Sequence, residues 1–199
     1  MRWDLLFGDL EAQLDQEQRD EERALAVEEE RLRLGRLTLR DRLTAMMRTD
    51  AADTDSAVRL ELIGGRSLVL RPLAFGRDWM SAAVVEARGS GAQCIVPMAA
   101  IAAVLPSRSQ LDPSLQPVPE SSARLAERIA LPFVLRDLCR RRSAVRITTL
   151  DGIVHGTIDR VARDHLDLAL HESGAPRRER EVQGYRIVPF ARVLLVEFG

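Results

Sequence analysis

Hydrophobic and polar residues alternate with a period of two in two separate stretches of the chain. The first stretch is AVRLELIGGRSLVL at residues 57 to 70, and the second is AVRITTLDGIVHGT at residues 144 to 157. Each contains a Gly-Gly or Asp-Gly pair, and glycine supplies the positive φ that a tight hairpin turn requires. Each stretch is therefore predicted to form a strand, a tight turn and a returning strand.

A second pair of similar stretches indicates an internal repeat. VPMAAIAAV at residues 96 to 104 returns as VPFARVLLV at residues 188 to 196. Proline cannot donate to a strand ladder, so Pro97 and Pro189 should mark a short turn before a last strand. Each repeat thus reads as about five short strands with one apolar face, and such a unit is expected to curl into a small barrel. The residues expected in the two cores are Leu60, Ile101 and Val104, and Ile147, Leu166, Leu168, Val193 and Val196.

A helix is predicted ahead of each barrel, and a proline-rich segment separates the repeats. The helical stretches are LTLRDRLTAMMR at 37 to 48 and LPFVLRDLCRRR at 131 to 142. Four prolines between residues 105 and 121 indicate a linker of extended character. The domains expected are an N-terminal helix at 1–36, a first barrel with its helix at 37–105, a linker at 106–121 and a second barrel with its helix at 122–199.

The first 36 residues have the pattern of a long amphipathic helix. Apolar residues recur at spacings of four, three and four in the set Trp3, Phe7, Leu10 and Leu14. A polar run follows, and Leu25 and Leu32 are then seven residues apart. Two interpretations stay open: the helix packs on the chain's own barrels, or it forms a coiled-coil contact with a second copy or a partner protein.

Composition limits the class of protein. The formal net charge of −1 hides an uneven distribution. Residues 1–50 hold 9 Arg and 13 acids, residues 51–121 hold 6 and 7, and residues 122–199 hold 14 and 10, so the chain runs from −4 through −1 to +4. The two cysteines form no Cys-x-x-Cys pair and no signal peptide precedes them, which favours a reducing cytoplasm. No apolar run approaches the ~20 residues that span a bilayer.

The second repeat resembles the first sequence motif of the Sm-like fold found in Sm, LSm and Hfq proteins. The matching residues are Val145, Ile147, Asp151, Gly152, Gly156, Asp164 and Leu166. The resemblance covers about two thirds of the chain and implies two tandem Sm-like, or SH3-like, barrels in a mainly β (α+β) fold. The whole layout, with its opening MRWDLLFGDLEAQL, also resembles a group of actinobacterial proteins, some labelled as transcriptional regulators.

The RNA-binding residues of that family are not carried over. Sm-like proteins hold RNA bases with a polar residue after the motif aspartate and with a basic pair before the last strand. This chain has Ser81 and Asp167 at the first position, and Val96-Pro97 and Val188-Pro189 at the second. Asp167 would repel phosphate, and a Val-Pro pair supplies no side-chain donor. The resemblance therefore implies the fold and not the RNA site.

Arginines of the second repeat form the candidate nucleic-acid site. They fall in two groups, one at the end of the helix and start of the first strand, the other in and after the polar hairpin HESGAPRRERE: Arg140, Arg141, Arg142, Arg146, Arg177, Arg178, Arg180 and Arg186. If the groups meet, their guanidinium groups could bind phosphates bidentately. The opposing interpretation is a solvated surface neutralised by nearby glutamates.

No catalytic or cofactor motif is present in the sequence. There is no phosphate-binding glycine loop, no zinc-protease helix and no nucleophile elbow. The histidines, His155, His165 and His171, are expected to be solvated or capping rather than metal-binding or catalytic. We therefore expect that the protein is not an enzyme and that it binds neither a metal ion nor a cofactor.

Two functions follow from these patterns. The preferred one is a non-catalytic scaffold or adaptor that associates with itself or a partner protein through Trp3, Phe7, Leu10 and Leu14 of the N-terminal helix. The alternative is a regulator that binds RNA or DNA through the arginines. Because two linked barrels can cover one strand edge each, a monomer or dimer is expected rather than a hexameric or heptameric ring.

Overall fold

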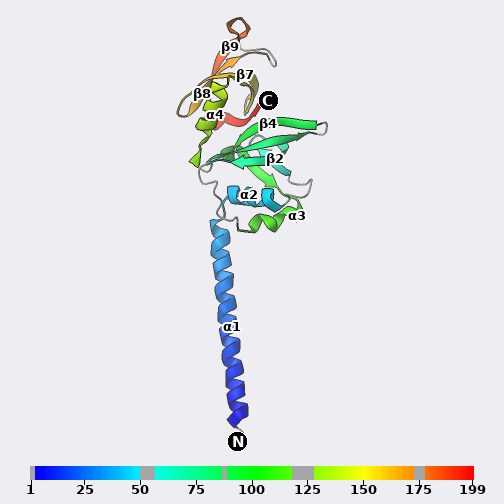
Figure 1. The fold of residues 1–199 in the computed structure, drawn as a ribbon, viewed down its shortest axis with the longest axis vertical. Coiled ribbons are helices and arrows are strands. Elements are labelled where there is room, and N and C mark those ends of the chain that lie inside the picture. Colours follow the sequence, from blue (N-terminus) through cyan, green and yellow to red (C-terminus); the bar gives the residue numbers. More distant parts are fainter. Residues whose placement is uncertain (1–2, 50–56, 87–88, 118–127, 173–177) are drawn as a thin grey trace. The chain divides into compact units, whose positions relative to one another are not determined.

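The computed structural model describes residues 3–49, 57–86, 89–117, 128–172 and 178–199. It divides into two compact units, Met1–Leu39 and Arg40–Gly199. The first unit consists almost entirely of helix α1 (Trp3–Arg36), which runs for 34 residues without a break (Figure 1). Arg33 and Arg36 lie in its last turn, where the carbonyl end of the helix dipole favours positive charge.

The second unit is built on ten antiparallel strands. Their bounds are β1 (Val58–Leu62), β2 (Ser67–Phe75), β3 (Trp79–Glu86), β4 (Gly89–Pro97), β5 (Ile101–Leu105), β6 (Ala144–Thr149), β7 (Gly152–Val161), β8 (His165–Leu170), β9 (Gly184–Pro189) and β10 (Val193–Phe198). They form one sheet in the order β5-β1-β2-β3-β4-β10-β6-β7-β8-β9. We call α2 with β1 to β5 the first half, and α4 with β6 to β10 the second half.

The prediction of two separate closed barrels is wrong. The ten strands make a single open sheet, and β4 of the first half pairs with β10 of the second in the register Ile95 to Val196. The strand order within each half is nevertheless the same, with the fifth strand beside the first. The alternation of apolar residues identifies strands and their faces, but it does not state which strand each edge pairs with. The α+β composition is as predicted.

The turns follow from the glycines and prolines singled out in the sequence. Gly64 and Gly65 adopt φ of 92° and 85° between β1 and β2, and Gly152 adopts 132° after β6. Pro97 and Pro189 each precede a single 3-10 turn, η1 (Met98–Ala100) and η6 (Phe190–Arg192), which leads into β5 or β10. The hairpin and last-strand predictions are confirmed.

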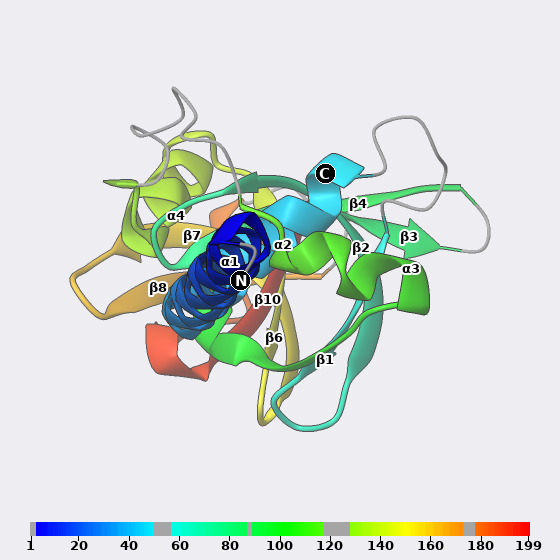
Figure 2. The same ribbon diagram turned by 90° about the horizontal axis from the view of Figure 1, so that it is seen from below.

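Helices cover the sheet where the repeat pattern places them. Helix α2 (Leu39–Thr49) buries Leu43 and Met46, and α4 (Leu131–Arg140) lies against β7 (Figure 2) and buries the stripe Leu131, Leu135 and Leu138. These positions recur at three or four residues, so one face of each helix meets the sheet.

The segment expected to be an extended linker contains two short helical turns. They are α3 (Arg108–Leu111) and η2 (Pro113–Leu115). The Arg42 guanidinium donates a hydrogen bond of 2.8 Å to the buried Ser114 hydroxyl, which ties this segment to α2. The rest of the proline-rich stretch, from residue 118, lies outside the described residues.

The two hydrophobic cores exchange residues across the junction of the halves. The core of the first half contains Leu194 and Leu195 of β10. The core of the second half contains Trp79 of β3 and Ile95 of β4. Six of the eight predicted core residues are buried: Leu60, Ile147, Leu166, Leu168, Val193 and Val196. Ile101 and Val104 of β5 are only partly buried, because β5 is an outermost strand of the sheet.

Candidate functional site

Helix α1 presents leucines to solvent along its length. We call Leu10, Leu14, Leu25 and Leu32 the α1 leucines. Leu14 and Leu25 are 64% and 65% exposed, and Leu10 and Leu32 are about half exposed. Trp3 and Phe7, the other members of the predicted stripe, belong to α1, but their side chains lie outside the described residues. In the described part of α1, the apolar side chains available for a contact therefore include the exposed α1 leucines.

The polar face of α1 holds its own charges in pairs. Arg23 contacts Asp20 at 2.9 Å, and Arg33 contacts Glu30 at 2.6 Å, each one turn apart. The hydrogen bond from Arg33 lowers the pKa of the Glu30 carboxyl below its ordinary value. Such exposed pairs, one turn apart, support a helix only slightly. The polar residues thus stabilise the helix locally, while the leucines remain in contact with water.

The arginines proposed for nucleic-acid binding are largely engaged with carboxylates. Arg140 and Arg141 both contact Asp137, at 2.5 and 2.7 Å. Arg142 lies 3.7 Å from Asp159. Two further pairs are Arg180 with Glu181, and Arg146 with Glu197. Each pair reduces the positive field that a phosphate would encounter.

The two arginine groups come from different parts of the sheet. Arg146 lies in β6 and Arg186 in β9, and strands β7 and β8 stand between them. Arg178 and Arg186 are exposed, and Arg177 lies outside the described residues. Arg146 and Arg186 are therefore separated by two strands of the sheet, and a cluster that joins both arginine groups stays a prediction.

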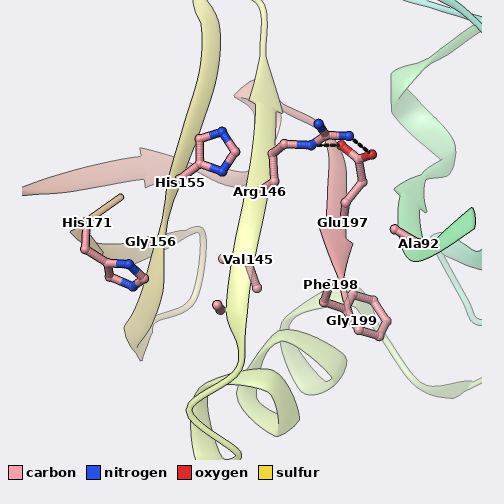
Figure 3. A pocket seen from close by; sticks show the side chains of 10 residues that line it. Ala92, Val145, Arg146, His155, Gly156, His171, Glu197, Phe198 and Gly199 are labelled. Carbon is pink, nitrogen blue, oxygen red and sulfur yellow. Dashed lines mark hydrogen bonds and ion pairs between the residues drawn. The ribbon is translucent and has the colours of Figure 1, made fainter. Parts of the chain in front are cut away.

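The structure also contains a cavity that no sequence motif predicts. It has a volume of about 410 Å³ and opens beside the junction of the halves (Figure 3). Its lining comes from β4, β6, β7, β10 and the end of β8: Ala92, Ala144, Val145, Arg146, His155, Gly156, His171, Glu197, Phe198 and Gly199. Strand β4 of the first half and strands β6, β7 and β10 of the second half thus contribute to one surface that spans both halves.

A polar row crosses the sheet beside this cavity. His155, Arg146, Glu197 and Cys94 lie directly opposite one another on the adjacent strands β7, β6, β10 and β4. The Arg146 guanidinium donates two hydrogen bonds to the buried Glu197 carboxylate: Nε donates to Oε2 at 2.7 Å, and Nη2 donates to Oε1 (Figure 3). Because the two charges cancel, this pair supports the junction more readily than it attracts a charged ligand.

The histidine at the end of β8 differs from expectation. His171 is buried rather than solvated. Its Nδ1 lies 3.0 Å from the Glu172 carbonyl oxygen, which can only accept, so Nδ1 donates. In the neutral ring, Nε2 then accepts from the Thr157 hydroxyl at 2.8 Å. Both ring nitrogens are engaged, which gives His171 a structural role in holding β7 to the end of β8.

His165 and Cys94 have local environments that argue against reactive roles. His165 Nδ1 donates to Asp164 Oδ1 at 2.7 Å on the surface, and this hydrogen bond lowers the pKa of the Asp164 carboxyl. Burial first, and then the Glu197 carboxylate, raise the pKa of the Cys94 thiol to about 12. A thiol with that pKa is protonated at neutral pH and is a poor nucleophile.

Metal-binding clusters and membrane-spanning helices are both absent from the described residues. Within them, no group of three or more His, Cys, Asp or Glu side chains could hold a metal ion. No helix among them combines the length and the apolar character needed to cross a bilayer.

The chain was also compared with known proteins. Comparisons with protein-family models, curated proteins and solved structures found no match. The resemblance to the Sm-like family therefore stays a prediction from the sequence, and function has to be argued from the surfaces of the chain itself.

Proposed function

We propose that the protein is a non-catalytic scaffold or adaptor whose helix α1 binds a helix of a second copy or of a partner protein. The observation that carries this proposal is the exposure of the α1 leucines on a helix of 34 residues. Full burial of a leucine contributes roughly 1.5 to 3 kcal/mol. The four leucines therefore offer enough apolar surface to stabilise a helix pair.

The stability of α1 itself supports a partner. An isolated helix in water is marginal even for favourable sequences, and most helical stability in proteins comes from packing of an apolar face. The ion pairs along α1 are exposed, so each contributes little. A second helix packed on the leucines would supply the missing stabilisation.

The remainder of the chain fits the role of a rigid body that α1 connects to other molecules. In the second unit, strand pairing is continuous from β5 to β9, and both cores include residues from both halves. We place the protein in the cytoplasm, where the two free cysteines, Cys94 and Cys139, would stay reduced.

Co-purification tests the proposal. Two differently tagged full-length copies are co-expressed, and one tag is captured together with its bound proteins. The variant Leu14→Gln, Leu25→Gln, Leu32→Gln removes apolar contacts and keeps residues that favour helix. A control variant, Gln13→Ala with Glu29→Ala, changes exposed polar positions of the same helix. We expect the leucine variant to lose the second copy or the partner, and the control to retain it.

The nucleic-acid alternative has less support. Of the described candidate arginines, Arg178 and Arg186 are exposed, but five others stand in ion pairs. If the alternative were correct, Arg178→Gln with Arg186→Gln would weaken binding to RNA or DNA of every sequence and reduce its salt dependence. Asp167→Asn would leave such binding in place, because the base-reading position of the Sm-like family is not used.

A further inference from the structure

The two outermost strands of the sheet are repeats of the two strands that meet at its centre. The internal junction joins β4, the fourth strand of the first half, to β10, the fifth strand of the second half. The ends of the sheet are β9, the fourth strand of the second half, and β5, the fifth strand of the first half. Each end strand therefore has a counterpart whose pairing within the chain is known.

At the internal junction, β4 places an isoleucine in the core of the other half. Ile95 lies opposite Val196 of β10 and is only 1% exposed. It belongs to the core of the second half, together with Val193 and Val196. Without β10 beside it, Ile95 would stand on the outer face of the first half.

Ile187 is the counterpart of Ile95 on the open strand β9. It precedes Val188-Pro189 as Ile95 precedes Val96-Pro97. It also lies opposite Asp167 of β8, as Ile95 lies opposite Ser81 of β3, at the matching place in each half. Ile187 is 68% exposed, and Tyr185 on the same strand is similarly exposed. This side chain is in water because, among the described strands, β9 is outermost and none lies against it as β10 lies against β4.

At the other end of the sheet, β5 lacks a neighbour that would cover its apolar residues as β4 covers those of β10. Val104 of β5 is the counterpart of Val196, and Ile101 that of Val193. Both β10 residues are buried, whereas Val104 and Ile101 are only partly buried against the core of the first half. The strand β5 therefore offers the kind of apolar surface that Ile95 covers at the internal junction.

We propose that β9 of one copy pairs antiparallel with β5 of a second copy, in the register of the internal junction. Ile187 would then lie opposite Val104 of the second copy and enter its first-half core. The contact is head to tail, so an open assembly keeps one free β5 at one end and one free β9 at the other until it closes into a ring. It uses the sheet and not α1, and so it does not rest on the proposed function. An open strand edge with exposed apolar residues is otherwise an aggregation hazard.

Two differences make the contact between copies weaker than the internal junction. The counterparts of Leu194 and Leu195 on β5 are Ala102 and Ala103, which bury less apolar surface. Arg186 stands at the position of Cys94, where its stem can cover Leu105 while the guanidinium stays in water. We therefore expect a reversible association that depends on concentration.

The mass of the full-length chain tests this pairing. All proteins carry the Leu14→Gln, Leu25→Gln, Leu32→Gln changes, so that association through α1 is removed. Sedimentation equilibrium over a concentration series is then compared for this parent, for Ile187→Lys on β9 and for Ala102→Lys on β5. Both replaced side chains are exposed, so each variant should fold, which circular dichroism verifies. Ile153→Lys, at an exposed isoleucine of the interior strand β7, is the matched control.

The expected pattern is specific to a head-to-tail contact. The parent and Ile153→Lys associate, and each edge variant raises the dissociation constant by about tenfold or more. Mixing Ile187→Lys with Ala102→Lys gives one-to-one dimers, because the first keeps its β5 edge and the second its β9 edge. Three results would overturn the proposal. The parent could be a monomer at every concentration, its dissociation constant could be the same in both edge variants, or the mixture of the two variants could stay monomeric. A parent that fails to associate only because the leucines are replaced would support the α1 proposal while overturning this one.

Discussion

At the scale of single residues, the two cysteines provide contrasting probes of the junction. Cys94 is fully buried in β4, and its pKa is raised to about 12, whereas Cys139 of α4 is partly exposed and its thiol donates to the Asp159 carbonyl at 3.4 Å. At pH 8 only the thiolate reacts quickly, and Cys94 holds almost none of that form. We expect one thiol to react with a disulfide reagent in the native state and the second only on unfolding.

Single-cysteine variants identify the two phases. Cys139→Ala should remove the fast phase, and Cys94→Ala should remove the slow one. A fast reaction of Cys94 in the folded protein would mean that β4 and β10 separate readily, and the continuous sheet would then be in error.

Side-chain burial follows from sequence only where a strand has neighbours on both sides. The period-two pattern correctly places Leu60, Ile147 and Leu166 in the cores. It overestimates the burial of Val104, because the pattern is silent on whether β5 is central or outermost. His171 has no signal in the sequence, since its partner Thr157 becomes its neighbour only through the pairing of β7 with β8.

At the scale of elements, the Arg146–Glu197 pair fastens β6 to β10 next to the junction. Glu197 is buried, while the Arg146 side chain is 39% exposed, so solvent screens part of the interaction. Replacing Arg146 by alanine leaves a buried carboxylate without its main partner. We expect a loss of about 1 to 3 kcal/mol in the free energy of unfolding, below the cost of breaking a fully buried pair.

The control for this prediction is an exposed pair of the same chemistry. Arg140 contacts Asp137 on the surface of α4, and Arg140→Ala should cost less than about 1 kcal/mol. Urea unfolding of both variants gives the comparison. Equal losses would show that Arg146 contributes no more than a surface arginine.

Elements were easier to predict than their assembly. The Gly-Gly and Asp-Gly turns, the proline-initiated last strands and the helices around Leu43 and Leu135 follow from local backbone and periodicity rules. The assembly of those strands into one open sheet rests on the contact of β4 with β10, which are separated in the sequence by β5, the segment between the halves, α4 and β6 to β9. Nothing in a period-two pattern distinguishes that pairing from closure of each half on itself.

At the scale of the whole molecule, the exchange of core residues predicts a single unfolding transition for the second unit. Leu60 belongs to the core of the first half and Ile147 to that of the second. Because Leu195 and Ile95 each belong to the core of the opposite half, neither core can open without disturbing the other. Leu60→Ala and Ile147→Ala should each lower the free energy of unfolding of this one transition, by ~2 to 4 kcal/mol.

Denaturant unfolding followed by fluorescence in a Trp3→Phe background checks this, since Trp79 is then the single tryptophan and lies in the second core. We expect the unfolding transitions followed by fluorescence and by circular dichroism near 215 nm to coincide in both alanine variants. Two separated transitions, with each variant moving only one of them, would mean that the halves are independent domains.

The most direct test of the adaptor proposal is capture of the tagged full-length protein before and after nuclease treatment. We expect a bound protein, either a second copy or another chain, that survives nuclease and is lost when Leu14, Leu25 and Leu32 are replaced by glutamine. Replacing Arg178 and Arg186 by glutamine should leave that capture unchanged. If the bound material instead disappears with nuclease and with the arginine changes, while the leucine variant captures as well as the native chain, the protein binds nucleic acid and the adaptor proposal is wrong.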